Sequence, residues 1–192
     1  AVASDLPVAA AKTGALGSAA IVAAVADAVR RHAIPHLVVD PVMISKHGHA
    51  LLEADAVEGL RTRILPLATL VTPNLPEAAG LAGFPGLTAE DMTRAAETIL
   101  ALGPRAVLVK GGHLEGATGA DDLFVEDGRT EWIRGERLDS RNTHGTGCTY
   151  SAAIATQLAH GRSLEEAIVR AKAYVTEAIR AVNLRPGDGL RA

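Results

Sequence analysis

The sequence contains one cysteine and very few aromatic residues. Cys148 stands alone, so the chain cannot form an internal disulfide, and such chains are typical of reducing compartments. Only 3% of the residues are aromatic, whereas 48% are hydrophobic. The core must therefore be built mainly from aliphatic side chains, and we expect a cytoplasmic protein.

Blocks of like charge and long apolar runs are also missing. The chain has 19 basic and 22 acidic residues and a formal net charge of −3, which argues against a nucleic acid partner. No apolar run approaches the roughly 20 residues that a membrane span needs. The first residues, AVASDLPVAA, lack the features of a signal peptide. We therefore expect neither nucleic acid nor membrane as a partner, and one domain over residues 1–192.

Two common nucleotide-binding fingerprints are absent. The pattern G-x-x-x-x-G-K-[ST] occurs nowhere, and the segment Gly145-Thr146-Gly147 lacks the third glycine of a dinucleotide-binding loop. These absences disfavour a P-loop enzyme and a nicotinamide-dependent dehydrogenase. Any phosphate group must therefore be held in another way.

Short apolar segments alternate with segments of helical periodicity. Strands are predicted at 8–13, 37–39, 68–71 and 106–109, and helices from 18, over 53–65, 77–81 and 88–102, from about 146, and over 163–182. Asp127-Gly128 between two further apolar segments predicts a β-hairpin at 122–134. This order predicts an α/β fold with a mostly parallel central sheet and helices on both faces, a three-layer α/β/α arrangement.

The residues of most interest lie just past the four predicted strands. Gly14, Asp40, Asn74 with Glu77, and Lys110 all take such positions. Because ligands of parallel sheets bind at the carboxyl ends of the strands, we expect these residues to line one crevice.

Three of these residues have side chains suited to a phosphate site. The carboxylates of Asp40 and Glu77 are suited to Mg²⁺, and the ammonium of Lys110 to phosphate. Asp40 and Lys110 also have plain alternatives: an aspartate before proline often forms a turn, and a lysine at a strand end is often solvated.

A glycine-rich segment, NTHGTGCT, opens the predicted helix after residue 142. Small residues at a helix start leave backbone N–H groups pointing outward with the helix dipole behind them, which predicts an anion site. An ordinary tight turn into a core helix is the other interpretation, and spacing alone favours neither. Cys148 lies in the first turn, where a thiol is often functional, although most lone cysteines are small buried hydrophobes.

Taken together, five segments resemble the ribokinase-like superfamily and, within it, the hydroxymethylpyrimidine kinases. They are AAKTGALG (10–17), VVDPVMISKHGHALL (38–52), LATLVTPNLPEAAGLAG (67–83), AVLVKGGHL (106–114) and NTHGTGCTYSAAIA (142–155). GTGC replaces the more usual GxGD of the superfamily, whose aspartate is the general base in sugar kinases. The resemblance implies two successive transfers from ATP, onto hydroxymethylpyrimidine and then onto its monophosphate, for thiamine synthesis.

The resemblance also implies roles for individual residues. It assigns the anion hole to Gly145, Thr146, Gly147 and Cys148, with Cys148 also accepting the substrate proton as the base. It assigns the contacts to ATP phosphates to Asn74, Lys110 and Thr146, and the Mg²⁺ site to Asp40 and Glu77. The pyrimidine pocket is assigned to Val42, Gly14, Ala15 and Cys148.

Departures from the family pattern leave alternatives open. Ala15 stands where the family usually has methionine, and the glycine-rich first strand and turn of the family are missing. We therefore expect a domain that is incomplete at its N-terminal side. A pyridoxine or pyridoxal kinase on the same scaffold is the nearest alternative, and a non-catalytic nucleotide-binding protein is an alternative of another class. The resemblance also suggests a homodimer.

Overall fold

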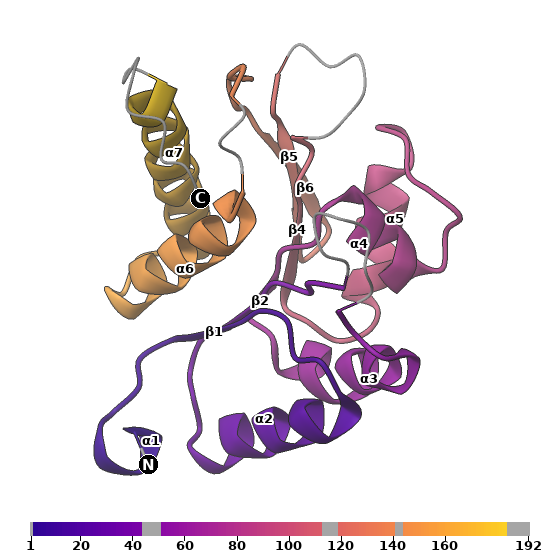
Figure 1. Cartoon of the computed structure of the whole chain (residues 1–192), viewed down its shortest axis with the longest axis vertical. Coiled ribbons are helices and arrows are strands. Elements are labelled where there is room, and N and C mark those ends of the chain that lie inside the picture. The colour runs from indigo at the N-terminus through magenta and orange to yellow at the C-terminus, as the bar shows by residue number, and fades with distance from the viewer. Residues whose placement is uncertain (1, 44–50, 113–118, 141–143, 184–192) are drawn as a thin grey trace.

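A computed structural model describes residues 2–43, 51–112, 119–140 and 144–183. Helices and strands alternate through most of this length (Figure 1). The strands are β1 (Ala11–Thr13), β2 (Leu37–Val39), β3 (Leu70–Val71), β4 (Ala106–Val109), β5 (Asp122–Glu126) and β6 (Arg129–Ile133). The helices are α1 (Val2–Asp5), α2 (Ala19–Arg31), α3 (Ala54–Gly59), α4 (Leu75–Ala82), α5 (Met92–Leu100), α6 (Thr146–Ala159) and α7 (Leu164–Asn183), with a π-helical turn (Leu60–Ile64) and a 3₁₀ turn (Leu65–Leu67) after α3.

The strands form one six-stranded sheet in the order β1-β2-β3-β4-β5-β6. β1 to β4 are parallel, and Lys12 pairs with Val38 and Val71 with Val107 across their ladders. β5 and β6 form an antiparallel hairpin through Asp127 and Gly128, both at positive φ, and β5 is antiparallel to β4. The predicted mostly parallel sheet and the predicted hairpin are therefore confirmed.

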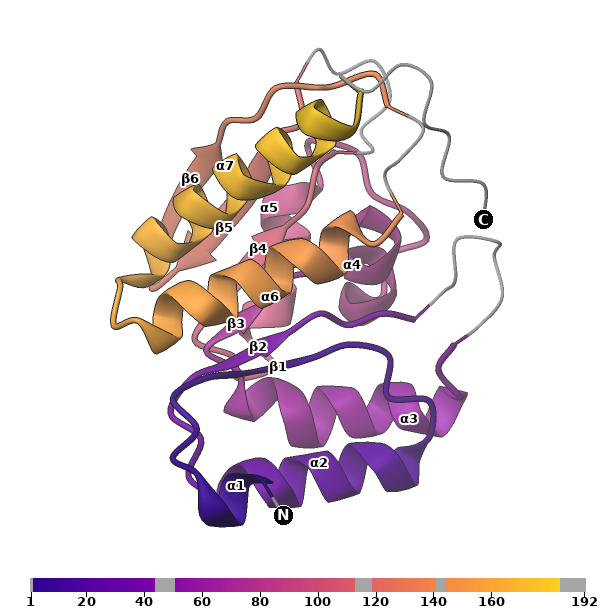
Figure 2. The same ribbon diagram turned by 60° about the vertical axis from the view of Figure 1, so that its left-hand side comes forward.

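Helices cover both faces of this sheet. Figure 1 shows α6 and α7 on one side of β4 to β6 and α4 and α5 on the other, and Figure 2 shows α2 and α3 side by side. Val38, Leu70 and Leu108 pack on the face of α6 and α7, whereas Val39 and Val107 pack on the opposite face. Strands buried on both faces read as continuous apolar runs, which is why LVV and AVLV predicted β2 and β4 without error.

Several boundaries differ from the prediction. β3 begins at Leu70 rather than at residue 68, and α4 begins at Leu75 rather than at residue 77. β1 begins at Ala11 rather than at residue 8, because only Ala11–Thr13 pair with β2. The helix expected over 53–65 changes into π-helical and 3₁₀ turns around Pro66, which has no N–H to donate. α5 begins at Met92: the predicted contact between Thr88 and Asp91 forms, but it closes the turn before the helix.

The two C-terminal helices are well defined at their starts. Gly145 adopts the left-handed conformation, with φ of 79°, directly before α6. Ser163 and Glu166 make the predicted capping box of α7, with reciprocal hydrogen bonds of 3.2 Å between their side chains and backbone N–H groups. None of the helices in the described ranges combines the length and the apolarity that crossing a membrane requires.

Candidate functional site

An ion pair joins the ends of two strands that are not neighbours. Lys110 Nζ lies 2.8 Å from Asp40 Oδ1, and the side chains are 14% and 2% exposed. The Asp40 N–H donates to the Thr13 carbonyl and the Lys110 N–H to the Pro73 carbonyl, so the hydrogen bonding of the sheet continues past β2 and β4. The structure thus brings these two predicted residues together over the end of β3.

The start of α6 lies against this ion pair. A Cβ added to Gly147 would be 3.2 Å from Lys110 Nζ and 3.9 Å from Asp40 Oδ2. The Ser151 hydroxyl lies 3.0 Å from the Cys148 carbonyl oxygen and 3.4 Å from Asp40 Oδ2. The glycine-rich segment therefore has direct access to a buried cation, which favours the anion site over an ordinary tight turn.

A second helix, α4, begins at the same edge of the sheet but is capped by its own side chains. Asn74 Oδ1 accepts from the Glu77 N–H at 2.9 Å, and Glu77 Oε2 accepts from the Asn74 N–H at 2.7 Å. α6 is preceded by Gly145, which has no side chain to cap its first turn. The dipole of α6, unlike that of α4, is therefore positioned for an external anion.

Glu77 combines burial with nearby charges. Its side chain is buried, and this desolvation raises the pKa of Glu77 from 4.5 to about 7; Lys110 and the hydrogen bond from Asn74 lower it, and Asp40 raises it. A divalent cation would favour the ionised form, so the carboxylates of Asp40 and Glu77 fit the oxygen ligands of Mg²⁺. Among the described residues, no group of three or more His, Cys, Asp or Glu could hold a metal ion by itself, so phosphate oxygens and water would have to complete the shell.

Glu77→Gln is expected to remove part of the dependence of the free energy of unfolding on pH. In the folded state Glu77 keeps its proton up to about pH 7, whereas the unfolded chain loses it near pH 4.5. The stabilisation that protonated Glu77 provides is therefore complete below pH 4.5 and is lost as the pH rises to about 7. Glutamine can still accept from the Asn74 N–H. Without Mg²⁺, denaturant unfolding at pH 5 and pH 8 should show that wild type loses up to about 3 kcal/mol more than the variant. Equal losses would contradict the raised pKa.

The remaining predicted residues lie around this centre. Thr146 opens α6 and is half-buried, and Cys148 in the same turn is exposed, which excludes the buried-hydrophobe interpretation of this thiol. Gly14 and Ala15 follow β1, and the Val42 N–H donates to the Asp40 carbonyl at 2.8 Å. The motif residues 142–143, and 44–50 of the segment that contains Val42, lie outside the described residues.

The sequence interpretation missed Ser151. This residue is fully buried, its hydroxyl lies within reach of the Asp40 carboxylate, and it follows Cys148 by one helical turn. The sequence carried no clear signal for it, because α6 also contains the hydroxyl residues Thr146, Thr149 and Thr156. Ser151 links α6 to β2 beneath the site.

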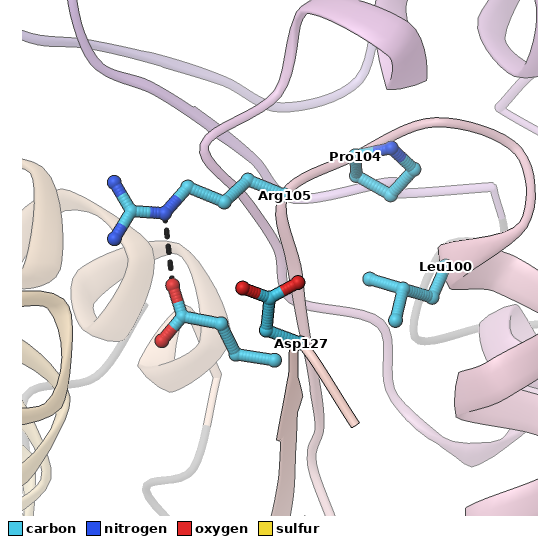
Figure 3. A pocket seen from close by; sticks show the side chains of 5 residues that line it. Leu100, Pro104, Arg105 and Asp127 are labelled. Atoms are coloured by element: carbon cyan, nitrogen blue, oxygen red, sulfur yellow. Dashed lines mark hydrogen bonds and ion pairs between the residues drawn. The ribbon is translucent and has the colours of Figure 1, made fainter. Parts of the chain in front are cut away.

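A pocket at the opposite end of the sheet has no connection with these residues. Its volume is about 480 Å³, and Leu100, Pro104, Arg105, Glu126 and Asp127 line it (Figure 3). Arg105 Nε donates to Glu126 Oε1 at 2.8 Å, so this arginine is paired with one of the two carboxylates that border the pocket. Ligands of parallel sheets bind at the other end, and we assign no function to this pocket.

The mixed six-stranded sheet and the helices on its two faces match the ribokinase-like α/β fold. The family model for phosphomethylpyrimidine kinase matches residues 1–191, and the chain belongs to this family. A hydroxymethylpyrimidine/phosphomethylpyrimidine kinase of Streptomyces coelicolor is 50% identical over 177 residues, which are 92% of this chain and 65% of that protein.

Two solved structures are similar to the whole arrangement. A phosphomethylpyrimidine kinase of Clostridium difficile is 40% identical, with a TM-score of 0.80 over 93% of this chain and 72% of that one. An ADP complex of Bacillus subtilis pyridoxal kinase is 37% identical, with a TM-score of 0.82 over 89% of this chain. This chain spans 63% of the Bacillus subtilis enzyme and 65% of the Streptomyces coelicolor protein.

Proposed function

We propose that this chain carries the phosphoryl-transfer site of a kinase that uses ATP to phosphorylate hydroxymethylpyrimidine and then its monophosphate, in thiamine biosynthesis. The observation that carries the proposal is the Lys110–Asp40 ion pair lying against Gly147 at the uncapped start of α6. This arrangement combines a cation, a carboxylate and helix N–H groups at one point. Phosphoryl transfer depends on such positioned charge more than on covalent chemistry.

Each residue has a role in this proposal. Lys110 and the amide nitrogen of Asn74 bind oxygens of the ATP phosphates, and the N–H groups of residues 145–148 stabilise the charge on the transferred group. The acceptor hydroxyl oxygen bonds to the γ-phosphorus while the bond to ADP breaks, and its proton passes to the exposed Cys148. Asp40 and Glu77 would hold Mg²⁺, which would neutralise phosphate charge. Residues 14, 15 and 42 line the pyrimidine side.

Pyridoxal is the second candidate acceptor. The likeness to Bacillus subtilis pyridoxal kinase, with a TM-score of 0.82, favours it. Pyridoxal and hydroxymethylpyrimidine both carry a hydroxymethyl group on a heteroaromatic ring, so the same phosphate machinery serves either. The acceptor pocket, rather than the Lys110–Asp40 centre, has to discriminate between them.

The test is ADP release with Mg-ATP when hydroxymethylpyrimidine, its monophosphate and pyridoxal are offered in parallel. We expect turnover on the pyrimidine and on its monophosphate. Turnover on pyridoxal alone would move the assignment to a vitamin B6 kinase. ATP binding without turnover on any acceptor would instead favour the non-catalytic nucleotide-binding alternative.

The setting of the chain is proposed on the same grounds. We propose that residues 1–192 belong to one domain, because a single sheet carries every strand in the described ranges. The lone cysteine supports a cytoplasmic location, and we propose a homodimer on the resemblance of the five segments to the kinase family. Sedimentation of the purified protein at micromolar concentration would distinguish a dimer from a monomer.

A further inference from the structure

A second buried ion pair lies outside the proposed phosphate site. Lys172 Nζ, on α7, lies 2.6 Å from Asp122 Oδ2, at the start of β5, and the side chains are 15% and 2% exposed. The same ammonium donates to the Ala120 carbonyl at 2.5 Å. Burial raises the pKa of Asp122, and the charge of Lys172 opposes that shift.

The other oxygen of this carboxylate reaches the segment that follows Lys110. Asp122 Oδ1 accepts from the Gly111 N–H at 3.0 Å, and the next carbonyl, of Gly112, accepts from Arg137 at 3.0 Å. The backbone next to Lys110 is thus fixed on one side by the Asp122 carboxylate. One carboxylate therefore connects α7 to the strand end that presents the phosphate-site lysine.

The packing around Lys172 fixes where its ammonium lies. A Cβ added to Gly135 would be 2.5 Å from Lys172 Cε and 2.6 Å from the Ala120 carbonyl oxygen, so only glycine leaves room for this side chain. The ammonium also lies 5.7 Å from the centre of the Tyr150 ring, on α6 two residues after Cys148. Lys172 accordingly contacts Tyr150 on α6 directly and reaches the Gly111 segment through the Asp122 carboxylate.

We infer that Asp122 and Lys172 are positioning residues, which hold Gly111 so that the neighbouring Lys110 keeps its place beside Asp40 and Gly147. This inference rests on the proposed function, because it assigns their effect to ATP phosphates bound by Lys110. Burying two charges costs desolvation energy that their attraction often fails to exceed, so stability alone is a weak reason for such a pair. Holding Gly111 and the neighbouring Lys110 in place explains the pair better.

The neighbouring carboxylates provide a matched comparison. Asp121 is paired with Arg134 on the surface and accepts from the Gly135 N–H, but only Asp122 reaches Gly111. Asp122→Asn is expected to lower kcat/KM for ATP by about 10- to 100-fold, chiefly through a raised KM and a weaker ATP affinity. Asp121→Asn is expected to change kcat/KM and the ATP affinity by less than about twofold. Equal effects of the two substitutions would overturn the inference.

A double-mutant cycle separates positioning from general stability. If Asp122 acts through Lys110, Asp122→Asn should cause no further loss of ATP affinity in a Lys110→Met background. Additive losses would show that Asp122 acts independently of Lys110. Lys172→Gln, which keeps a donor for the Ala120 carbonyl, provides a second variant with the same expectation.

Folding and the assigned activity have their own readouts. Thermal unfolding of each variant gives its folded fraction at the assay temperature. If the loss of kcat/KM is no larger than the loss of folded protein, the pair has only a structural role and the inference is wrong. Absence of turnover by the wild type would contradict the proposed kinase activity alone. ATP affinity measured by titration calorimetry would still test the cycle.

Discussion

Gly147→Leu is expected to abolish nearly all phosphoryl transfer. A Cβ at this position would already lie 3.2 Å from Lys110 Nζ and 3.9 Å from Asp40 Oδ2, and a longer side chain would fill the space that a transferred phosphate needs. Loss of a single oxyanion donor typically lowers the rate about 10²- to 10³-fold. We therefore expect kcat/KM to fall by about 10³-fold or more in the coupled ADP-release assay.

Three comparisons make this result specific. Gly86→Leu is the matched control, because Gly86 is exposed, does not have a left-handed φ and would place a Cβ in open space. Gly147→Ala adds only the Cβ that lies 3.2 Å from Lys110 Nζ, so a smaller loss of activity than in Gly147→Leu is expected. Cys148→Ala removes only the proposed proton acceptor, so a smaller loss is expected. Full turnover by Gly147→Leu would exclude this turn as the phosphate site.

Lys110→Met is expected to damage both activity and stability. It removes the cation proposed to bind ATP phosphates and leaves the carboxylate of Asp40, 2% exposed, without its partner at 2.8 Å. Breaking a buried pair in this way costs about 3–5 kcal/mol, and loss of the cation should lower kcat/KM by about 10²- to 10³-fold. Urea unfolding and ADP release measure the two effects separately.

The other end of the same strand supplies the control. Arg105 directly precedes β4, whereas Lys110 directly follows it. Arg105 pairs with Glu126 at 2.8 Å, and its side chain is 64% exposed. Arg105→Met should cost less than about 1 kcal/mol and leave activity unchanged. Asp40→Asn combined with Lys110→Met should recover part of the stability but none of the activity. Recovery of activity in that double variant would contradict the proposed role of Lys110.

The strand ends of the site could be predicted from the sequence, because local signals determine them. Apolar runs bounded by Asp40-Pro41 and by Lys110 defined β2 and β4, and the rule for parallel sheets then placed both polar residues at one edge. The contacts that hold these residues could not be predicted. Lys172 meets Asp122 fifty positions away, and no local pattern predicts a partner at that separation.

A related difference concerns Asn74 and Glu77. Both were interpreted as ligands, yet in the structure each also caps α4 through the other's backbone N–H. The spacing of asparagine and glutamate is itself the signature of a capping box, so this structural role was readable in the sequence. The capped helix leaves the amide nitrogen of Asn74 and the charge of Glu77 as their means of acting on a ligand.

The order of the strands bears on how the protein forms during synthesis. Each strand pairs with the one made just before it, so the sheet can grow at one edge while the ribosome is still extending the chain. α6 instead packs back onto β1 and β2, and its residue Ile154 shares a core with Val38. The phosphate site is therefore expected to close only when α6 has emerged from the ribosome. Until then the nascent sheet exposes an apolar face, which chaperones can protect.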